Sequence, residues 1–171
     1  MSVAERVRSL SRDHERLSES EGYRAEPESG GQTVKPVLVG ELNPFGGTDD
    51  YALYPAPDGC SGHRLCCLIL AMSRKDYLES FDRVNLCEGK WSIRAAKLRA
   101  EQLCDGGVSG EDEEQPLILL GSKVSAAFSL PFRPFEQFGE DLLILPHPSG
   151  LCRLWGEKGA FERARLAVVA F

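Results

Sequence analysis

The sequence predicts an α/β fold, namely a three-layer α/β/α sandwich around a central, mainly parallel sheet of four strands. Short runs rich in apolar residues, of the kind that form buried strands, recur at residues 37–39, 83–87, 117–120 and 142–145. Segments with helical spacing of apolar residues separate these runs. This alternation of strand and helix is typical of a parallel, doubly wound sheet.

Length and composition fit one globular domain. The chain has 171 residues, of which 42% are hydrophobic and 27% are charged. No apolar run reaches the length of a membrane span, and the amino terminus lacks the apolar core of a signal peptide. We therefore expect a cytoplasmic protein with no membrane partner. Because the net charge is −6, a nucleic-acid partner would require a local basic patch.

Residues 1–34 are expected to form an amphipathic arm and linker, separate from a domain over residues 35–171. Apolar residues of the arm recur at roughly helical spacing among many charged ones. Acidic residues outnumber basic ones there, so a solvated helix is favoured over an arm that grips DNA.

The first strand, residues 37–39, is apolar and β-branched, and it breaks into glycines and Pro44. Such a rigid turn would hold Glu41 and Asn43 at the carboxyl end of the strand. Open α/β sheets bind their ligands at that edge. The next passage, residues 48–63, lacks periodicity but carries tyrosines, which favours a binding loop over a disordered segment.

Helical spacing predicts an amphipathic helix over residues 64–74, which residues 75–81 either extend or follow as a second short helix. The second strand, residues 83–87, then ends in a polar break. A helix over residues 91–104 has its basic residues on the solvent side, and an acidic surface loop over 105–115 follows.

The third strand, residues 117–120, leads into Ser122 and a helix over residues 123–128. Ser122 could cap this helix or bind a phosphate, and the sequence leaves both open. The fourth strand, residues 142–145, ends in a Pro-His-Pro-Ser-Gly loop, and residues 157–171 form a closing helix.

Each predicted strand is followed by a polar side chain that could serve one cleft. In chain order these are Asn43, Asn85, Ser122, and then His147 with Ser149. An ordinary structural role is open for several of them, since an Asn before Pro commonly forms a turn and a strand-end Asn can cap its own turn. His147 could also be a loop histidine without a function, but its position between two prolines favours function.

Two of these loops resemble motifs of the uracil-DNA glycosylase superfamily. Gly-Glu-Leu-Asn-Pro-Phe at residues 40–45 is similar to its water-activating loop, and Leu-Pro-His-Pro-Ser-Gly-Leu at residues 145–151 to its base-gripping loop. The resemblance covers about residues 36–170. The second loop is most similar to the mismatch-specific branch, although that branch has Asn where His147 stands and the uracil-specific branches have His.

The resemblance implies a role for each site residue. Asn43 would orient the attacking water, and His147 would donate a hydrogen bond to a carbonyl of the base. Phe45 would form a wall of the pocket, Tyr54 would stack on the flipped base, and Asn85 would read its Watson–Crick edge.

The same loops would bind the DNA around the flipped base. Ser122, Ser149 and Gly150 would contact phosphates, and Leu151 would fill the gap in the duplex. Arg153 would contribute the local positive charge that the net charge of the chain hides.

One departure from the motif puts the water-orienting residue in question. The first loop has one more residue than usual before Pro44, so Glu41 could take the polar role, as in the thermophile-type branch. That branch holds an iron–sulfur cluster with four cysteines, and Cys87 and Cys104 resemble only the later two. The six cysteines include no Cys-x-x-Cys pair, and we expect buried thiols and no metal or cofactor.

These expectations together imply a monomeric, monofunctional DNA glycosylase that leaves an abasic site without a metal or a lyase lysine. One alternative keeps the chemistry but has a bulky modified cytosine of phage or foreign DNA as the substrate, in a defence role. Another alternative is a catalytically silent member that binds DNA or a protein through the same cleft.

Overall fold

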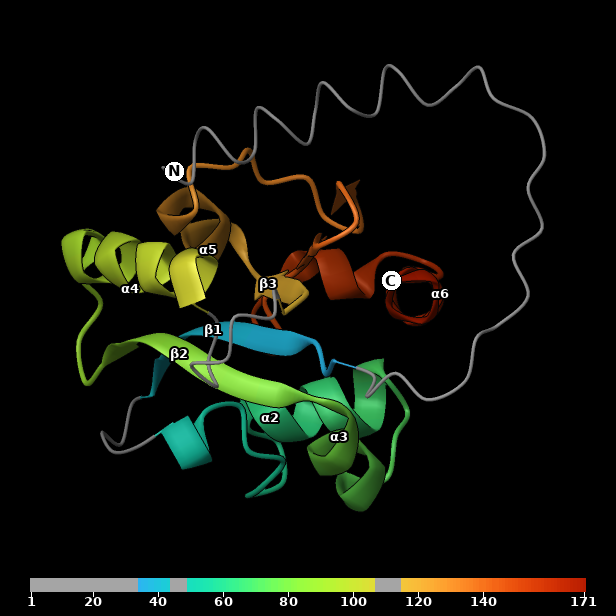
Figure 1. Cartoon of the computed structure of the whole chain (residues 1–171). Helices are drawn as coiled ribbons and strands as arrows, with labels where there is room; N and C mark the ends of the chain where they lie inside the picture. Colours follow the sequence, from blue (N-terminus) through green and yellow to red (C-terminus); the bar gives the residue numbers. More distant parts are fainter. Residues whose placement is uncertain (1–33, 44–48, 107–114) are drawn as a thin grey trace, which may run out of the picture.

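Five strands form the central sheet of the computed structural model, which describes residues 34–43, 49–106 and 115–171 (Figure 1). Their order across the sheet is β2-β1-β3-β5-β4. The first four of this order are mutually parallel, and β4 runs antiparallel to β5. The strands are β1 (Val37–Asn43), β2 (Asp82–Glu88), β3 (Leu117–Leu120), β4 (Gln137–Phe138) and β5 (Leu142–Leu145).

The α/β class is confirmed, but the predicted number of strands is wrong, because the sheet is mixed and has five. All four predicted runs are parallel strands. The additional strand, β4, pairs through Gln137 with Leu143 and through Phe138 with Leu142. A strand of two residues is too short to show an alternation of apolar and polar side chains in the sequence.

Strand β1 continues past the predicted break at Gly40. Its later residues stay paired with β2, Gly40 opposite Asn85 and Leu42 opposite Cys87. Gly40 is needed inside the strand because a Cβ at this position would lie 2.2 Å from Oδ1 of Asn85. The expectation that Glu41 lies in a turn is therefore wrong, since Glu41 is a strand residue.

The helices agree with the predicted positions except in one region. The predicted helix over residues 64–74 is shorter than expected, because the π-helix η3 ends at Ile69 and Ala71 has a φ of 56°. Of the two alternatives for residues 75–81, a second short helix is confirmed. Ser73 then caps a separate helix, its hydroxyl accepting from the backbone N–H of Asp76. The described helices are α2 (Ser61–His63), η3 (Arg64–Ile69), α3 (Arg74–Ser80), α4 (Ile93–Gly106), α5 (Ser122–Ala127) and α6 (Ala160–Ala170), with the 3-10 turns η2 (Asp49–Tyr51) and η4 (Arg153–Gly156).

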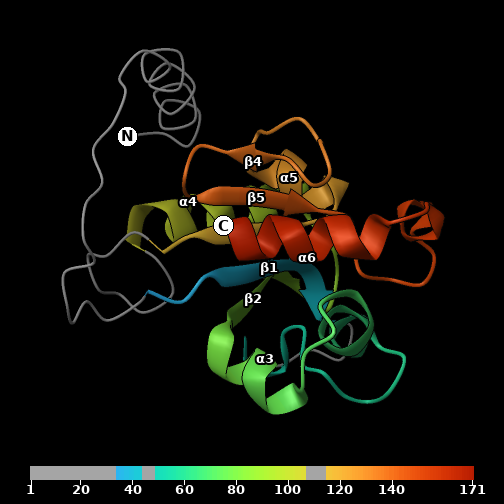
Figure 2. The same cartoon turned by 90° about the vertical axis from the view of Figure 1, so that its right-hand side faces the viewer.

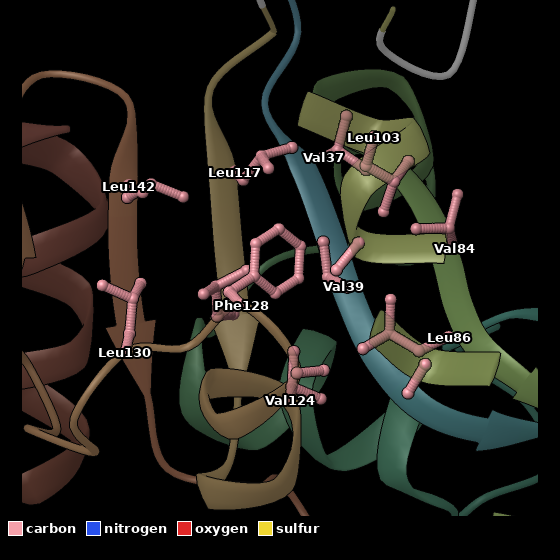
Figure 3. Close-up of a cluster of buried hydrophobic side chains, with 14 of the residues drawn as sticks. Val37, Val39, Val84, Leu86, Leu103, Leu117, Val124, Phe128, Leu130 and Leu142 are labelled. Carbon is pink, nitrogen blue, oxygen red and sulfur yellow. The ribbon is translucent and has the colours of Figure 1, made fainter. Parts of the chain in front are cut away.

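Helices cover both faces of the sheet (Figures 1 and 2). Val37 and Val39 of β1 point to one face, where α4 and α5 pack and Phe128 is fully buried (Figure 3). Leu38 points to the other face, onto η3, α3 and α6. This alternation follows the period of two in a strand. None of the helices within the described part of the chain is long and apolar enough to span a membrane.

The sheet brings together the loops that the sequence analysis singled out. Because β1, β3 and β5 are parallel and adjacent, their carboxyl ends lie at the same edge. Asn43 ends β1, Ser122 follows β3 and His147 follows β5. Three of the four predicted strand ends therefore lie at one edge with their polar residues, whereas Asn85 lies inside β2.

The contact between Gly40 and Asn85 can be tested by a double-mutant cycle. We expect Gly40→Ala to lower the free energy of unfolding by about 1–3 kcal/mol, because the added methyl group overlaps the Asn85 amide. Asn85→Ala in the same chain should recover part of this loss. Urea denaturation measures both.

Gly156→Ala is the matched control, since nothing lies within 4 Å of a Cβ at that position. Strictly additive effects of Gly40→Ala and Asn85→Ala would contradict the proposed overlap.

Candidate active site

His147 lies in a loop that two hydrogen bonds hold against neighbouring elements, and a third hydrogen bond within the loop orients its ring. The indole Nε1 of Trp155 donates to the carbonyl of His147 at 2.7 Å, and Nε of Arg64 donates to the carbonyl of Pro148 at 3.0 Å. The backbone N–H of Ser149 donates to Nδ1 of the imidazole at 3.2 Å. Both the backbone and the ring of His147 are therefore fixed.

The protonation state of His147 follows from these contacts. Burial lowers the pKa of the imidazole, and the Lys123 ammonium lowers it further, while the Glu41 carboxylate raises it. Since Nδ1 accepts a hydrogen bond, the single proton of the neutral ring is on Nε2. Among residues 34–43, 49–106 and 115–171, no acceptor is hydrogen-bonded to Nε2. The ring thus presents a neutral N–H donor.

Gly121 permits the close approach of β3 to His147. Its φ is +99°, and a Cβ there would lie 2.9 Å from Cβ of His147. Gly121 is also the N-cap residue of α5, so the expectation that Ser122 caps this helix is wrong. The positive φ requires glycine at the cap, and Ser122 becomes the exposed first residue of α5.

Glu41 and Lys123 form an ion pair beside His147. Nζ of Lys123 lies 2.9 Å from Oε2 of Glu41, whose side chain is only 19% exposed. The same ammonium lies 5.6 Å from the ring centroid of Trp91. Gly121, two residues before Lys123, lies against His147, and both charges act on the pKa of its imidazole. We refer to Glu41 of β1, Lys123 of α5 and His147 of the loop after β5 as one cluster.

Lys123 was not among the predicted site residues. Its signal in the sequence is a cation in the first turn of the helix after a buried strand. The positive end of the helix dipole disfavours a cation there.

Asn43 is the last residue of β1 and is buried, with 6% of its surface exposed. Its backbone carbonyl accepts a hydrogen bond from the N–H of Gly89 at 3.3 Å. Asn43 therefore lies at the predicted edge, as part of a paired strand. Phe45 lies outside the described residues.

Asn85 and Tyr54 belong to the opposite face of β1 from Glu41. Asn85 pairs with Gly40, and consecutive residues of a strand point to opposite faces. Asn85 is thus inside β2, and its expected place at a strand end is wrong. Tyr54 is half-exposed, with the guanidinium of Arg83 5.7 Å from its ring centroid. The structure does not place these two residues against the cluster of Glu41, Lys123 and His147.

The predicted DNA-contacting residues surround the His147 loop. Leu151 is 92% exposed, Gly150 and Arg153 are exposed, and Ser149 is half-buried. Cζ of Arg64 would lie 3.7 Å from a Cβ at Gly150, so a second guanidinium adjoins this loop. Arg64, predicted only as the start of a helix, thus adds local positive charge.

The arrangement offers hydrogen bonding and proton transfer at the sheet edge. Asn43 ends β1, Glu41 lies two residues before it, and His147 follows β5 at the same edge. Within the described part of the chain, no group of three or more His, Cys, Asp or Glu side chains could hold a metal ion. No family model matches the chain, and neither a curated protein nor a solved structure matches it. The chemistry of these side chains is therefore the basis for inferring a function.

The state of His147 can be measured directly by NMR of the imidazole nitrogens. We expect an unprotonated Nδ1, a protonated Nε2 and a pKa below the ordinary value of about 6.5. His147→Gln identifies the resonances, and His63 serves as the internal reference. A ring protonated on Nδ1 near neutral pH would contradict the assignment.

The lowered pKa of His147 also makes the stability depend on pH. The unfolded chain takes up this proton at about pH 6.5, before the folded protein does. The contribution of neutral His147 to the free energy of unfolding is therefore complete above pH 6.5. It is lost as the pH falls from there to the pKa of His147 in the folded protein. His147→Gln should remove this part of the pH dependence in urea titrations.

Proposed function

We propose that the protein is a monofunctional DNA glycosylase, similar to the uracil-DNA glycosylase superfamily, that hydrolyses the N-glycosidic bond of a flipped pyrimidine. The observation that carries this proposal is the fixed, neutral His147 donor at the edge where Asn43 also lies. The product would be an abasic site, and the protein would act as a monomer without a metal or cofactor.

Cleavage of an N-glycosidic bond separates charge, and the site suits that requirement. The departing base becomes an anion, and the sugar becomes cationic. A donor already aimed at the position of the developing charge lowers the barrier more than a donor that must reorient. In the proposed complex, Nε2 of His147 donates to a carbonyl oxygen of the base, while the N–H of Ser149 keeps the ring in place.

Two residues can act on the water and the sugar. The side-chain oxygen of Asn43 would accept a hydrogen bond from the attacking water and so orient it. Glu41 would place its carboxylate near the cationic sugar and accept the proton of the water. The ion pair with Lys123 holds this carboxylate at the sheet edge.

The surrounding loops provide contacts for a flipped nucleotide. Leu151 is exposed enough to enter the duplex in place of the base. Arg64 and Arg153, with Ser149, would bind the phosphates on either side. Tyr54 has a half-exposed ring that could stack on the base.

The proposed activity can be tested on duplexes that contain uracil, thymine opposite guanine, or a modified cytosine. We expect one of them to acquire alkali-labile sites and to stay intact without alkali. No adduct should form with borohydride, because a monofunctional enzyme makes no imine. Excision of only the modified cytosine would point to a role against foreign DNA. Tight binding with no excision of any base would support a silent, DNA-binding protein instead.

The roles of the cluster predict distinct losses in single-turnover rate. His147→Ala should reduce the rate about 10²–10³-fold, since it removes one preorganised donor. If the amide orients the water, Asn43→Ala should reduce the rate by a similar factor. If the carboxylate orients it, Glu41→Gln should cause that reduction instead. Thermal unfolding checks that each variant is folded.

His63→Ala is the matched control, because His63 lies in α2, where its Nδ1 accepts from the N–H of Gly59 at 3.0 Å. Full activity of His147→Ala would remove the basis of the proposed mechanism.

A further inference from the structure

We propose that Lys123 is a positioning residue of the excision site: its ammonium holds the Glu41 carboxylate at the sheet edge, two residues after Gly121, which lies against His147. The inference rests on the proposed function for its catalytic consequence. Its electrostatic part concerns the free protein and can be measured without a substrate.

Two contacts fix the ammonium of Lys123. One is the 2.9 Å ion pair with Oε2 of Glu41, and the other is the ring of Trp91, whose centroid is 5.6 Å away. The partners come from different parts of the chain, β1 and the segment before α4. A lysine side chain has many rotamers, so two separate anchors indicate a defined position.

The position of Lys123 in α5 does not help the helix. It is the second residue of α5, where the positive end of the backbone dipole disfavours a cation. The compensating charge is Glu41, which belongs to a neighbouring strand. The ion pair therefore explains the lysine better than helix formation does.

The charged and polar groups around His147 come from four elements. Glu41 of β1 raises the pKa of His147, and Lys123 of α5 lowers it. Arg64 of η3 binds the carbonyl of the next residue, and Trp155 of η4 binds the carbonyl of His147 itself. The two backbone contacts fix the loop, and the first two groups set the charge balance at the imidazole.

Loss of the Lys123 charge would favour the imidazolium form of His147. A proton on Nδ1 would face the N–H of Ser149, and two donors cannot form a hydrogen bond with each other. The turn that orients the ring would then lose its anchor. In the proposed reaction, the rate would fall at a higher pH than in the parent protein.

The experiment is an NMR titration of His147 in the full chain, with the pH profile of excision alongside. We expect Lys123→Met to move the midpoint of His147 to higher pH, because Glu41 then acts unopposed. Lys123→Arg, which keeps the charge, should stay near the parent. Glu41→Gln should move the midpoint to lower pH, and the double variant Lys123→Met with Glu41→Gln should return it towards the parent.

Lys97→Met on the exposed side of α4 is the matched control and should leave the titration unchanged. An unchanged or lower midpoint in Lys123→Met would overturn the inference, as would equal effects of Met and Arg. If Lys123→Met does not fold, the test rests on Glu41→Gln alone, and an unchanged His147 midpoint in that variant would overturn the inference. Shifted midpoints without any excision in the parent would refute the proposed function and leave the electrostatic coupling standing.

Discussion

The candidate site depends on one close approach, between Gly121 at the end of β3 and His147 after β5. A side chain at Gly121 would overlap Cβ of His147, and its φ of +99° requires glycine in any case. Because β3 lies between β5 and β1, this approach brings the imidazole towards the residues at the end of β1. Trp155 and Arg64 then fix the loop through hydrogen bonds to the carbonyls of His147 and Pro148.

Charge balance is the second property that organises the site. Glu41 is largely buried, and a buried carboxylate without a partner would be costly. Lys123 compensates it, so that the imidazole of His147 is governed mainly by its own burial. In the proposed reaction, the neutral N–H donor would stabilise the negative charge that develops on the base, and the Glu41 carboxylate would stabilise the cationic sugar.

Local patterns in the sequence predicted most of the sheet, whereas long-range contacts decided the rest. The runs at 117–120 and 142–145 are strands because their residues are continuously apolar, which is a short-range signal. Gly40 reads as a break, but it continues β1 because Asn85 of a distant segment fills the space beside it. The role of Lys123 was equally hard to predict, because its partner Glu41 is distant in the sequence and lies on strand β1. The pattern of apolar residues after Arg64 also fits a helix of ordinary pitch and could not reveal the π-helix.

Strand β1 divides the candidate site between its two faces. Glu41 points to the α5 side, where it pairs with Lys123, while Gly40 points to Asn85 and Leu53. In the proposed glycosylase, Glu41 and His147 would act on the sugar and on a carbonyl of the base, while residues 49–60 would contact the rest of the base. Because the contacts of Glu41, Lys123 and His147 do not involve residues 49–60, substitutions in that loop could change the accepted base without disturbing the charge balance. Such a division would let one catalytic arrangement serve substrates of different size.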